Sequence, residues 1–269
     1  MFAITESDKH LNIAAYLKRI NYPVNEGCSV APTAETLREL QLAHLRAVPF
    51  ENLSIHAGQP IVLEDAALFT KIVENKRGGF CYEANGLFAA LLRALGFEVE
   101  MLSAQVANAA GEFGPDFDHM TLMVSLEQRW LVDVGFGDSF LEPLLLDERG
   151  EQVQGNRAYQ IVSDGSHLVL KQRVDGEKWQ AQYRFTLQTH SYADYAEMCR
   201  FHQTSPESHF TKSRICSRAT DEGRITLSGM RFITTANSGG HQVRGERTLA
   251  SDAEYAQVLC EQFGIVMTS

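Results

Sequence analysis

Cys81 has the surroundings of a reactive cysteine. It follows a glycine pair at 78–79 that gives the backbone room for a tight turn, and a helical pattern begins directly after it. The positive end of a helix dipole favours thiolate over thiol, and Arg77 adds a positive charge nearby. We therefore expect a lowered pKa and a nucleophilic role for Cys81. The alternative is a small buried apolar residue, as free cysteines usually are.

A cysteine nucleophile needs a base, and the base needs an acceptor that orients it. Of the histidines, His119 is the best candidate for this base, because it directly precedes an apolar strand pattern over 120–126. Asp133 lies in a second apolar pattern over 130–134, where a buried carboxylate is costly unless it is paired. Asp133 could instead cap a turn or lie at a sheet edge. If the two strands are neighbours, these residues and Cys81 form a catalytic triad.

The loop between the two strands decides whether His119 and Asp133 share a face. Side chains alternate between the faces of a strand, and directly paired residues of antiparallel neighbours share one. A two-residue turn would place Asp133 on the face opposite His119, whereas an odd loop centred on Glu127 would place it across from Thr121, on the same face. We predict an odd loop or a bulge between residues 126 and 129.

The sequence predicts helices first and strands afterwards. Three amphipathic helical patterns precede residue 97: one capped by Ser7 or Asp8, one capped by Thr33, and one over 82–95 that stops at Gly96. The short alternating or β-rich segments that follow indicate an antiparallel sheet or small barrel. They cover 99–106, 120–126, 130–134, 159–162, 167–174 and 179–185.

The last part of the chain predicts a smaller mixed region. A hairpin is expected around Gly229, and the capping box Ser251–Glu254 opens a final helix. No repeat or long linker separates the parts, so we expect one α+β body with three regions. These are a helical region over 1–96 that carries the nucleophile, an antiparallel sheet or small barrel over 97–200 that carries the histidine and aspartate, and a mixed region over 201–269.

Composition narrows the class of protein. The 269 residues carry a net charge of −10, which argues against a binder of nucleic acid or of anionic membranes. No apolar run approaches the ~18 residues that span a bilayer, and the first residues lack the basic start of a signal peptide, so a cytoplasmic protein is expected. No CxxC or HExxH pattern occurs, so no metal is expected. The cysteines expected to be reduced and without function are Cys28, Cys199, Cys216 and Cys260.

Several segments, in order, make the sequence resemble the arylamine N-acetyltransferase family. They are 49–53 (PFENL), 77–85 (RGGFCYEAN), the strand that His119 opens, 132–137 (VDVGFG) and 203–210 (QTSPESHF). The resemblance covers nearly the whole chain. It implies a helical bundle, a β-barrel and an α/β lid, with a triad like that of the cysteine proteases.

The resemblance also implies a ping-pong reaction. Cys81, as a thiolate beside protonated His119, takes the acetyl group of acetyl-CoA, and an arylamine, arylhydrazine or N-hydroxyarylamine then removes it. His119 acts as base toward the amine, while Asp133 fixes the imidazole tautomer and stabilises its charged form. Acetyl-CoA is thus a co-substrate and no cofactor is permanently bound. The protein is expected to be a monomer or a homodimer.

The same resemblance assigns two binding regions. The side chains expected around the acceptor are Phe50, Val106, Phe136 and Phe201. The residues expected to contact the coenzyme are Gly135, Phe136, Gly137 and Ser208. No Walker A loop is present to hold the pyrophosphate. Asp118 and Glu207 depart from the family pattern, because many relatives carry a small or hydroxyl residue at the first position and a neutral residue at the second.

Other functions use the same residue types. A papain-like or transglutaminase-like hydrolase also pairs cysteine with histidine, a non-catalytic relative could bind coenzyme A, and a family-related amide synthase would act on a biosynthetic intermediate. The complete triad argues against the non-catalytic alternative. Acetylation of Cys81 by acetyl-CoA would separate the acetyltransferase from the hydrolase. The physiological acceptor stays open.

Overall fold

The computed structural model describes residues 11–23, 30–238 and 241–267. The cap predicted at Ser7 or Asp8 lies outside these residues. Within them the first helix, α1 (Ile13–Arg19), is capped instead by Asn12, whose side chain accepts a hydrogen bond from the backbone N–H of Ala15 at 3.0 Å. No helix in the described ranges is long and apolar enough to cross a membrane.

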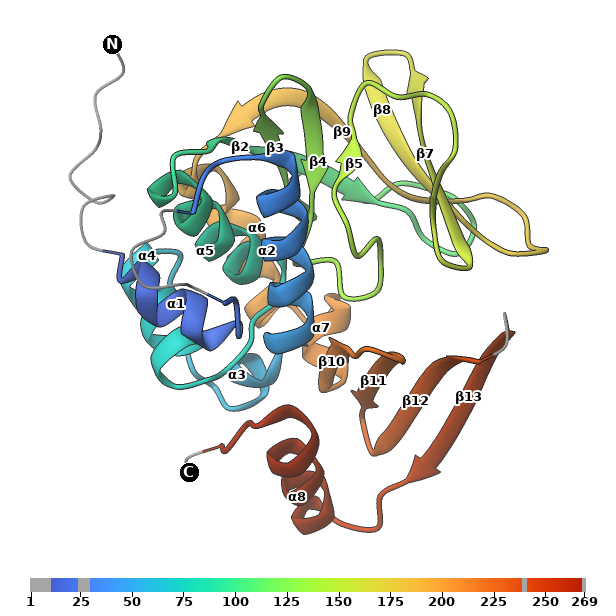
Figure 1. The fold of residues 1–269 in the computed structure, drawn as a ribbon. Coiled ribbons are helices and arrows are strands. Elements are labelled where there is room, and N and C mark those ends of the chain that lie inside the picture. The colour runs from blue at the N-terminus through green and yellow to red at the C-terminus, as the bar shows by residue number, and fades with distance from the viewer. Residues whose placement is uncertain (1–10, 24–29, 239–240, 268–269) are drawn as a thin grey trace.

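The N-terminal helices surround one buried helix, α5 (Cys81–Ala94), which Figure 1 shows in green. Before it come α2 (Ala34–Ala47), α3 (Leu53–His56), α4 (Asp65–Phe69) and the π-helical turn η2 (Thr70–Glu74). Thr33 caps α2 as predicted, with its hydroxyl accepting from Thr36 N–H. Residues 81–92 of α5 are all buried, so the helix is packed on every side. Its first residue, Cys81, is therefore held inside the protein.

The middle of the chain forms an eight-stranded antiparallel sheet that curls into a nearly closed barrel. In pairing order the strands are β5 (Leu144–Leu145), β4 (Arg129–Val132), β3 (His119–Ser125), β2 (Glu98–Val106), β9 (Gln180–His190), β8 (His167–Val174), β7 (Arg157–Asp164) and β6 (Gln152–Gln154). Every strand expected in this region is present, although several ends differ from the prediction. Strands β5 and β6 were not predicted, because they are too short to show the alternation of apolar and polar residues that is typical of a strand.

Neighbouring residues of the barrel strands belong to different cores, because side chains alternate between the faces of a strand. Met101 and Leu122 pack in the cluster that contains α5, whereas the next residues, Leu102 and Met123, pack in the barrel interior. Strands β2 and β3 both contact α5. One wall of the barrel is therefore also the surface that supports the helix of Cys81.

The hairpin of β3 and β4 has the odd loop that the sequence predicted. Leu122 pairs with Val132 and Ser125 pairs with Arg129, which leaves the three residues 126–128 in the loop. The loop is closed by a hydrogen bond from Leu126 N–H to the carbonyl of Gln128 at 3.0 Å. The centre of the loop is Glu127, and the register continues to Thr121 opposite Asp133. His119 and Asp133 consequently lie on one face of the hairpin.

The C-terminal part is a second antiparallel sheet with a helix packed on it. Two helices, α6 (Tyr192–Thr204) and α7 (His209–Lys212), lead from the barrel to this sheet, whose strands pair in the order β1 (Phe50–Glu51), β10 (Ile215–Ala219), β11 (Gly223–Ser228), β12 (Arg231–Ser238) and β13 (His241–Thr248). The hairpin predicted at Gly229 is confirmed by the Ser228–Arg231 pair. Ser251 caps α8 (Asp252–Phe263) by accepting from Glu254 N–H, but the Glu254 carboxylate accepts from Ala250 N–H, so only half of the predicted capping box forms. Figure 1 shows β10 to β13 and α8 in orange to red, below the barrel strands.

One of the two predicted region boundaries falls between two elements of secondary structure, and the other falls inside a helix. The first, between 96 and 97, falls in the connection from α5 to β2. The second, between 200 and 201, falls inside α6, which continues without a break to Thr204. Strand β1 also leaves the helical region to join the C-terminal sheet, where Phe50 pairs with Ser217. The division into three domains at these boundaries stays a prediction.

Candidate active site

The loop before Cys81 requires glycine at positions 78 and 79. A Cβ on Gly78 would overlap the carbonyl oxygen of Pro49, and one on Gly79 would lie 2.6 Å from Cβ of Glu83. Two backbone hydrogen bonds tie the loop to β1, from Glu51 N–H to the Gly79 carbonyl at 3.0 Å and from Gly79 N–H to the Pro49 carbonyl at 3.3 Å. The glycine pair therefore allows the close approach that sets Cys81 at the start of α5.

Arg77 does not supply a free positive charge beside the cysteine. Its guanidinium is buried and contacts the fully buried Glu51 carboxylate, with Nη2 and Oε1 2.8 Å apart. Burial alone would raise the pKa of Glu51, but Lys71 and Arg77 hold it below its ordinary value. The expectation that Arg77 would polarise Cys81 is therefore replaced by a structural role, because this pair joins β1 to the loop.

His119 and Asp133 form a buried pair. Nε2 of His119 lies 2.7 Å from Oδ2 of Asp133, and both side chains are at most 3% exposed. The other carboxylate oxygen, Oδ1, accepts from Asn85 Nδ2 and from the Gly135 N–H, each at 2.9 Å. Tyr183 donates its hydroxyl hydrogen to Oδ2 at 3.1 Å. The carboxylate is fully hydrogen-bonded, which satisfies the requirement for burying an acid.

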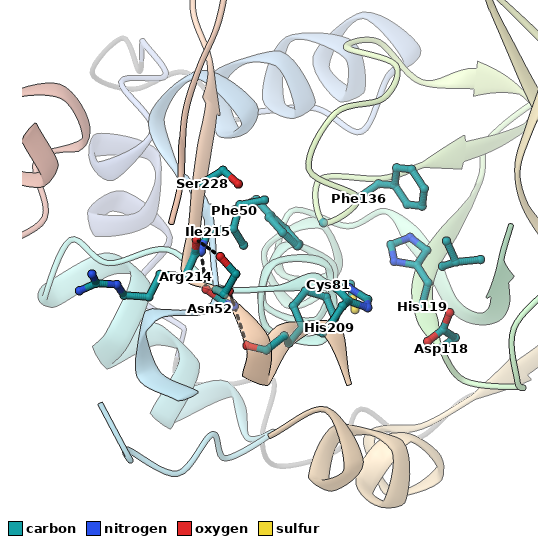
Figure 2. A pocket seen from close by; sticks show the side chains of 14 residues that line it. Phe50, Asn52, Cys81, Asp118, His119, Phe136, His209, Arg214, Ile215 and Ser228 are labelled. Carbon is teal, nitrogen blue, oxygen red and sulfur yellow. Dashed lines mark hydrogen bonds between the residues drawn. The ribbon is translucent and has the colours of Figure 1, made fainter. Parts of the chain in front are cut away.

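Cys81 and His119 line the same cavity, whose volume is about 350 Å³ (Figure 2). The residues around it are Phe50, Asn52, Cys81, Val106, Asp118, His119, Gly135, Phe136, His209, Phe210, Ser213, Arg214, Ile215 and Ser228. A volume of this size is typical of a small-molecule site. Since Asp133 occupies Nε2 of His119, Nδ1 is the ring nitrogen left to exchange a proton inside the cavity.

The electrostatics of Cys81 differ from the expectation. Burial raises the pKa of the Cys81 thiol well above its ordinary value, a backbone hydrogen bond with Met120 opposes this, and Asp118 and Asp133 raise it further. Desolvation is the largest contribution, so the expectation of a lowered pKa for Cys81 is wrong. A thiolate can form here only if the proton passes to a base that then balances the charge, and His119 is such a base in the cavity.

Comparisons with known proteins decide the family. A family model described as N-acetyltransferase matches residues 33–269. The arylamine N-acetyltransferase / N-hydroxyarylamine O-acetyltransferase of Salmonella typhimurium is 35% identical over 237 residues, which cover 87% of this chain and 83% of that protein. The chain belongs to the arylamine N-acetyltransferase family. The resemblance inferred from the sequence is thereby confirmed.

Solved structures of arylamine N-acetyltransferases have the same fold. The enzyme from Salmonella typhimurium superposes with a TM-score of 0.86 at 32% identity, over 99% of this chain and 94% of that one. The enzyme from Mycobacterium marinum, solved in complex with CoA, gives a TM-score of 0.84 at 32% identity, over 94% of this chain and 93% of that one. The α+β architecture and the barrel therefore match the family.

The structure brings together most of the predicted binding residues of this arylamine N-acetyltransferase family member. Phe50, Val106, Gly135 and Phe136 line the cavity. Gly135 fits only without a side chain, because a Cβ would lie 2.7 Å from Cα of Cys81. Gly137 does not line the cavity, but its backbone, with φ +92°, lies against the Phe50 ring.

Two predicted residues lie elsewhere. Phe201 is 38% exposed and outside the cavity. Ser208 is buried behind the wall, with its Oγ 3.1 Å from Nδ1 of His202, so its predicted coenzyme contact gains no support. The aromatic residue that the sequence analysis missed is Phe210, which lines the cavity and closes the segment 203–210 on which the resemblance rested. The match of this segment to the family was the sequence feature that could have identified Phe210.

The remaining cysteines have no site of their own. Cys199 and Cys216 are buried and Cys260 is exposed, and none of the three forms a disulfide within the described residues. Cys28 lies outside the residues that the structure describes. Across the described part of the chain, no three or more histidine, cysteine or acidic side chains gather as a metal site would require.

Proposed function

We propose that this protein is an acetyl-CoA-dependent arylamine N-acetyltransferase that works through an acetyl thioester on Cys81. The observation that carries the proposal is the shared cavity of Cys81 and His119, with Asp133 2.7 Å behind the imidazole, in a chain of this family. Cysteine, base and orienting acid are the groups that acyl transfer through a covalent intermediate requires.

In the first half-reaction the Cys81 proton moves to Nδ1 of His119 and the thiolate attacks the thioester carbonyl. Asp133 stabilises the imidazolium that forms, which offsets the cost of the buried charges. The tetrahedral intermediate collapses, and coenzyme A leaves as a thiol with the proton from His119. Because one thioester replaces another, Cys81 stores the acetyl group with little loss of free energy.

In the second half-reaction an acceptor amine attacks the acetyl group on Cys81. Arylamines have a low pKa and are neutral near pH 7, so the nitrogen lone pair is available. Nδ1 of His119 accepts the proton that the amine loses. The intermediate expels Cys81, the amide leaves, and the cysteine–histidine pair returns to its first state.

The cavity walls suggest where each substrate binds. Phe50, Val106, Phe136 and Phe210 offer apolar surface of a size suited to an aromatic ring. The turn 135–137 can bring its backbone close to a ligand beside Cys81, which supports it as a coenzyme contact. These assignments are part of the proposal, as is acetyl-CoA as the donor.

Intact-protein and peptide mass spectrometry test the proposal. Acetyl-CoA without an acceptor should add one acetyl group, mapped to Cys81, and a following arylamine should remove it. The Cys81→Ser variant should not form the thioester, and the exposed Cys260 of the wild type is an internal control for unspecific acetylation. The absence of an acetyl-enzyme on Cys81 would contradict the proposal. Acylation only by a larger biosynthetic thioester would favour the amide synthase, and peptide cleavage would favour the hydrolase.

A further inference from the structure

The Asp118 carboxylate stands in the wall of the reactive cavity with spare hydrogen-bonding capacity. Its side chain is 16% exposed, and Figure 2 shows it beside His119, on the side away from Phe136. Oδ1 lies 3.3 Å from Nε2 of His202 without a hydrogen bond, and Oδ2 lies against Gly114, where a Cβ would come within 2.9 Å of it. A partly buried carboxyl group gains free energy when a donor reaches it, and neither side-chain oxygen of Asp118 accepts a hydrogen bond from a described residue.

His202 lies against this carboxylate and is itself held in a fixed position. Ser208 Oγ accepts from the Phe210 N–H at 3.2 Å, so its own hydrogen is free to be donated to Nδ1 of His202, 3.1 Å away. The two ring nitrogens of His202 therefore face Ser208 on one side and Asp118 on the other. The ring is also fixed between Tyr82 and Phe210. Asp118 is therefore a carboxyl group with a fixed place in the cavity wall.

Among the described residues, no other basic side chain of the cavity wall forms an ion pair with Asp118. Burial and the neighbouring His202 lower the pKa of His209, so that histidine is neutral near pH 7. Arg214 lies on the far side of the cavity in Figure 2, where its guanidinium contacts Asp252 at 2.9 Å and stacks on Tyr255 at 4.1 Å. The end of the cavity beside Cys81 is consequently acidic.

We propose that Asp118 sets the acceptor specificity: the enzyme prefers aromatic amines and hydrazines that carry a cationic or N–H-donating group, and it discriminates against those that carry a carboxylate. This proposal rests on the proposed acetyltransferase function. A cationic or donor group can hydrogen-bond to the side-chain oxygens of Asp118, whereas an anionic group meets a like charge there. A buried polar group left unpaired is a strong source of discrimination.

Matched acceptors test the proposal in a two-step measurement. Cys81 is first acetylated with acetyl-CoA, and the acetyl-enzyme is then mixed with aminobenzoate, aminobenzamide or aminobenzamidine. These share a ring and differ in the charge of one group, and the meta and para isomers sample both directions of approach. Comparing each variant with the wild type cancels the intrinsic reactivity of each amine.

In the Asp118→Asn variant, the rate constant for aminobenzoate relative to aminobenzamidine should rise about tenfold or more. Asp118→Ser, which also lacks the carboxyl group, should change this ratio of rate constants in the same direction. Asp116→Asn is the matched control, because Asp116 is exposed, hydrogen-bonds to Gln105, and lies outside the cavity. It should leave the ratio unchanged.

The acetylation step and the acceptor step test the two proposals separately. Acetylation of Cys81 in the first step tests the proposed function, and the acceptor ratio in the second tests Asp118. An unchanged ratio in both Asp118 variants would overturn the proposal. So would an effect confined to the acetyl-CoA step, since that would assign the carboxylate to the coenzyme.

Discussion

The Tyr183 hydroxyl donates a hydrogen bond to Oδ2 of Asp133, the same oxygen that lies 2.7 Å from the His119 ring. Tyr183 is on β9 and Asp133 follows β4, two strands separated by β3 and β2 in the sheet order. Curling of the barrel brings them together. Burial, and then the Asp133 carboxylate, raise the pKa of Tyr183 well above its ordinary value, so the phenol stays a donor.

Replacement of Tyr183 by phenylalanine should weaken both catalysis and stability. One donor to the Asp133 carboxylate is lost, which removes about 1.5–3 kcal/mol from the free energy of unfolding. If about 1.4 kcal/mol of this stabilises the imidazolium, kcat falls roughly tenfold. Urea unfolding and steady-state kinetics measure the two effects. Tyr159→Phe, at another fully buried tyrosine of the barrel core, is the control, and an equal loss of kcat there would contradict a specific role for Tyr183.

The Asp133→Asn variant should lose most of its acetyl transfer. Oδ1 accepts from Asn85 and Gly135, and Oδ2 accepts from His119 and Tyr183, so either orientation of an amide would turn its NH₂ toward two donors. We expect a fall in rate on the order of 10³-fold or more and a loss of about 2 kcal/mol or more in the free energy of unfolding.

Single-turnover kinetics and urea unfolding measure these effects of Asp133→Asn. Asp147→Asn is a matched control, because Asp147 is an exposed acid paired with Arg129 of the same hairpin. Transfer at the wild-type rate in Asp133→Asn would remove Asp133 from the mechanism.

The sequence predicted features that depend on local periodicity. The two-residue period of a strand, together with the requirement that His119 and Asp133 share a face, predicted an odd loop or a bulge between residues 126 and 129. The structure has an odd loop centred on Glu127. The start of α5 at Cys81 followed from the glycine pair and the apolar pattern after it. In these cases neighbours in the sequence determine the geometry.

Features that depend on distant contacts could not be predicted in this way. The sign of the Cys81 pKa shift comes from desolvation by the whole fold, which no local pattern reports. Arg77 is neutralised by Glu51, on a strand that belongs to the C-terminal sheet. The turn from α6 to α7 brings Phe210, and not Phe201, to the cavity, and only the packing of that turn decides between the two rings.

The reactivity of Cys81 should depend on His119. In the wild type, iodoacetamide should modify Cys81 faster than the exposed Cys260 near neutral pH, because His119 can hold the thiol proton. In His119→Ala, burial and the carboxylates Asp118 and Asp133 raise the Cys81 pKa with no base to oppose them. A rise of one in the pKa lowers the thiolate population about tenfold, so Cys81 should become slower than Cys260. Peptide mass spectrometry follows both sites, and a Cys81 that reacts no faster than Cys260 in the wild type contradicts its assignment as nucleophile.

His44 is a buried histidine that has no part in the cavity. On α2 it is 0% exposed, and its Nδ1 lies 3.0 Å from the Tyr16 hydroxyl, while its ring edge packs on Phe88. Burial raises the pKa of Tyr16, so the phenol donates and Nδ1 accepts. Nε2 then carries the ring proton and has no partner among the described residues. Burial, assisted by Arg19, lowers the pKa of His44 from 6.5 to about 3.

Acid should therefore destabilise the protein through His44. The unfolded chain binds a proton at this site near pH 6.5, and the folded chain does so only near pH 3. The stability that this neutral histidine gives is fully present above pH 6.5, and it falls by about 1.4 kcal/mol for each pH unit toward pH 3. The Tyr16→Phe/His44→Leu variant, which leaves no hydroxyl unpaired, should lose about 2 kcal/mol less than the wild type between pH 7 and pH 5. Urea unfolding at the two pH values measures this difference, with the half-buried His167→Gln as control. Equal losses in the double variant and the wild type would show that His44 is not the group responsible.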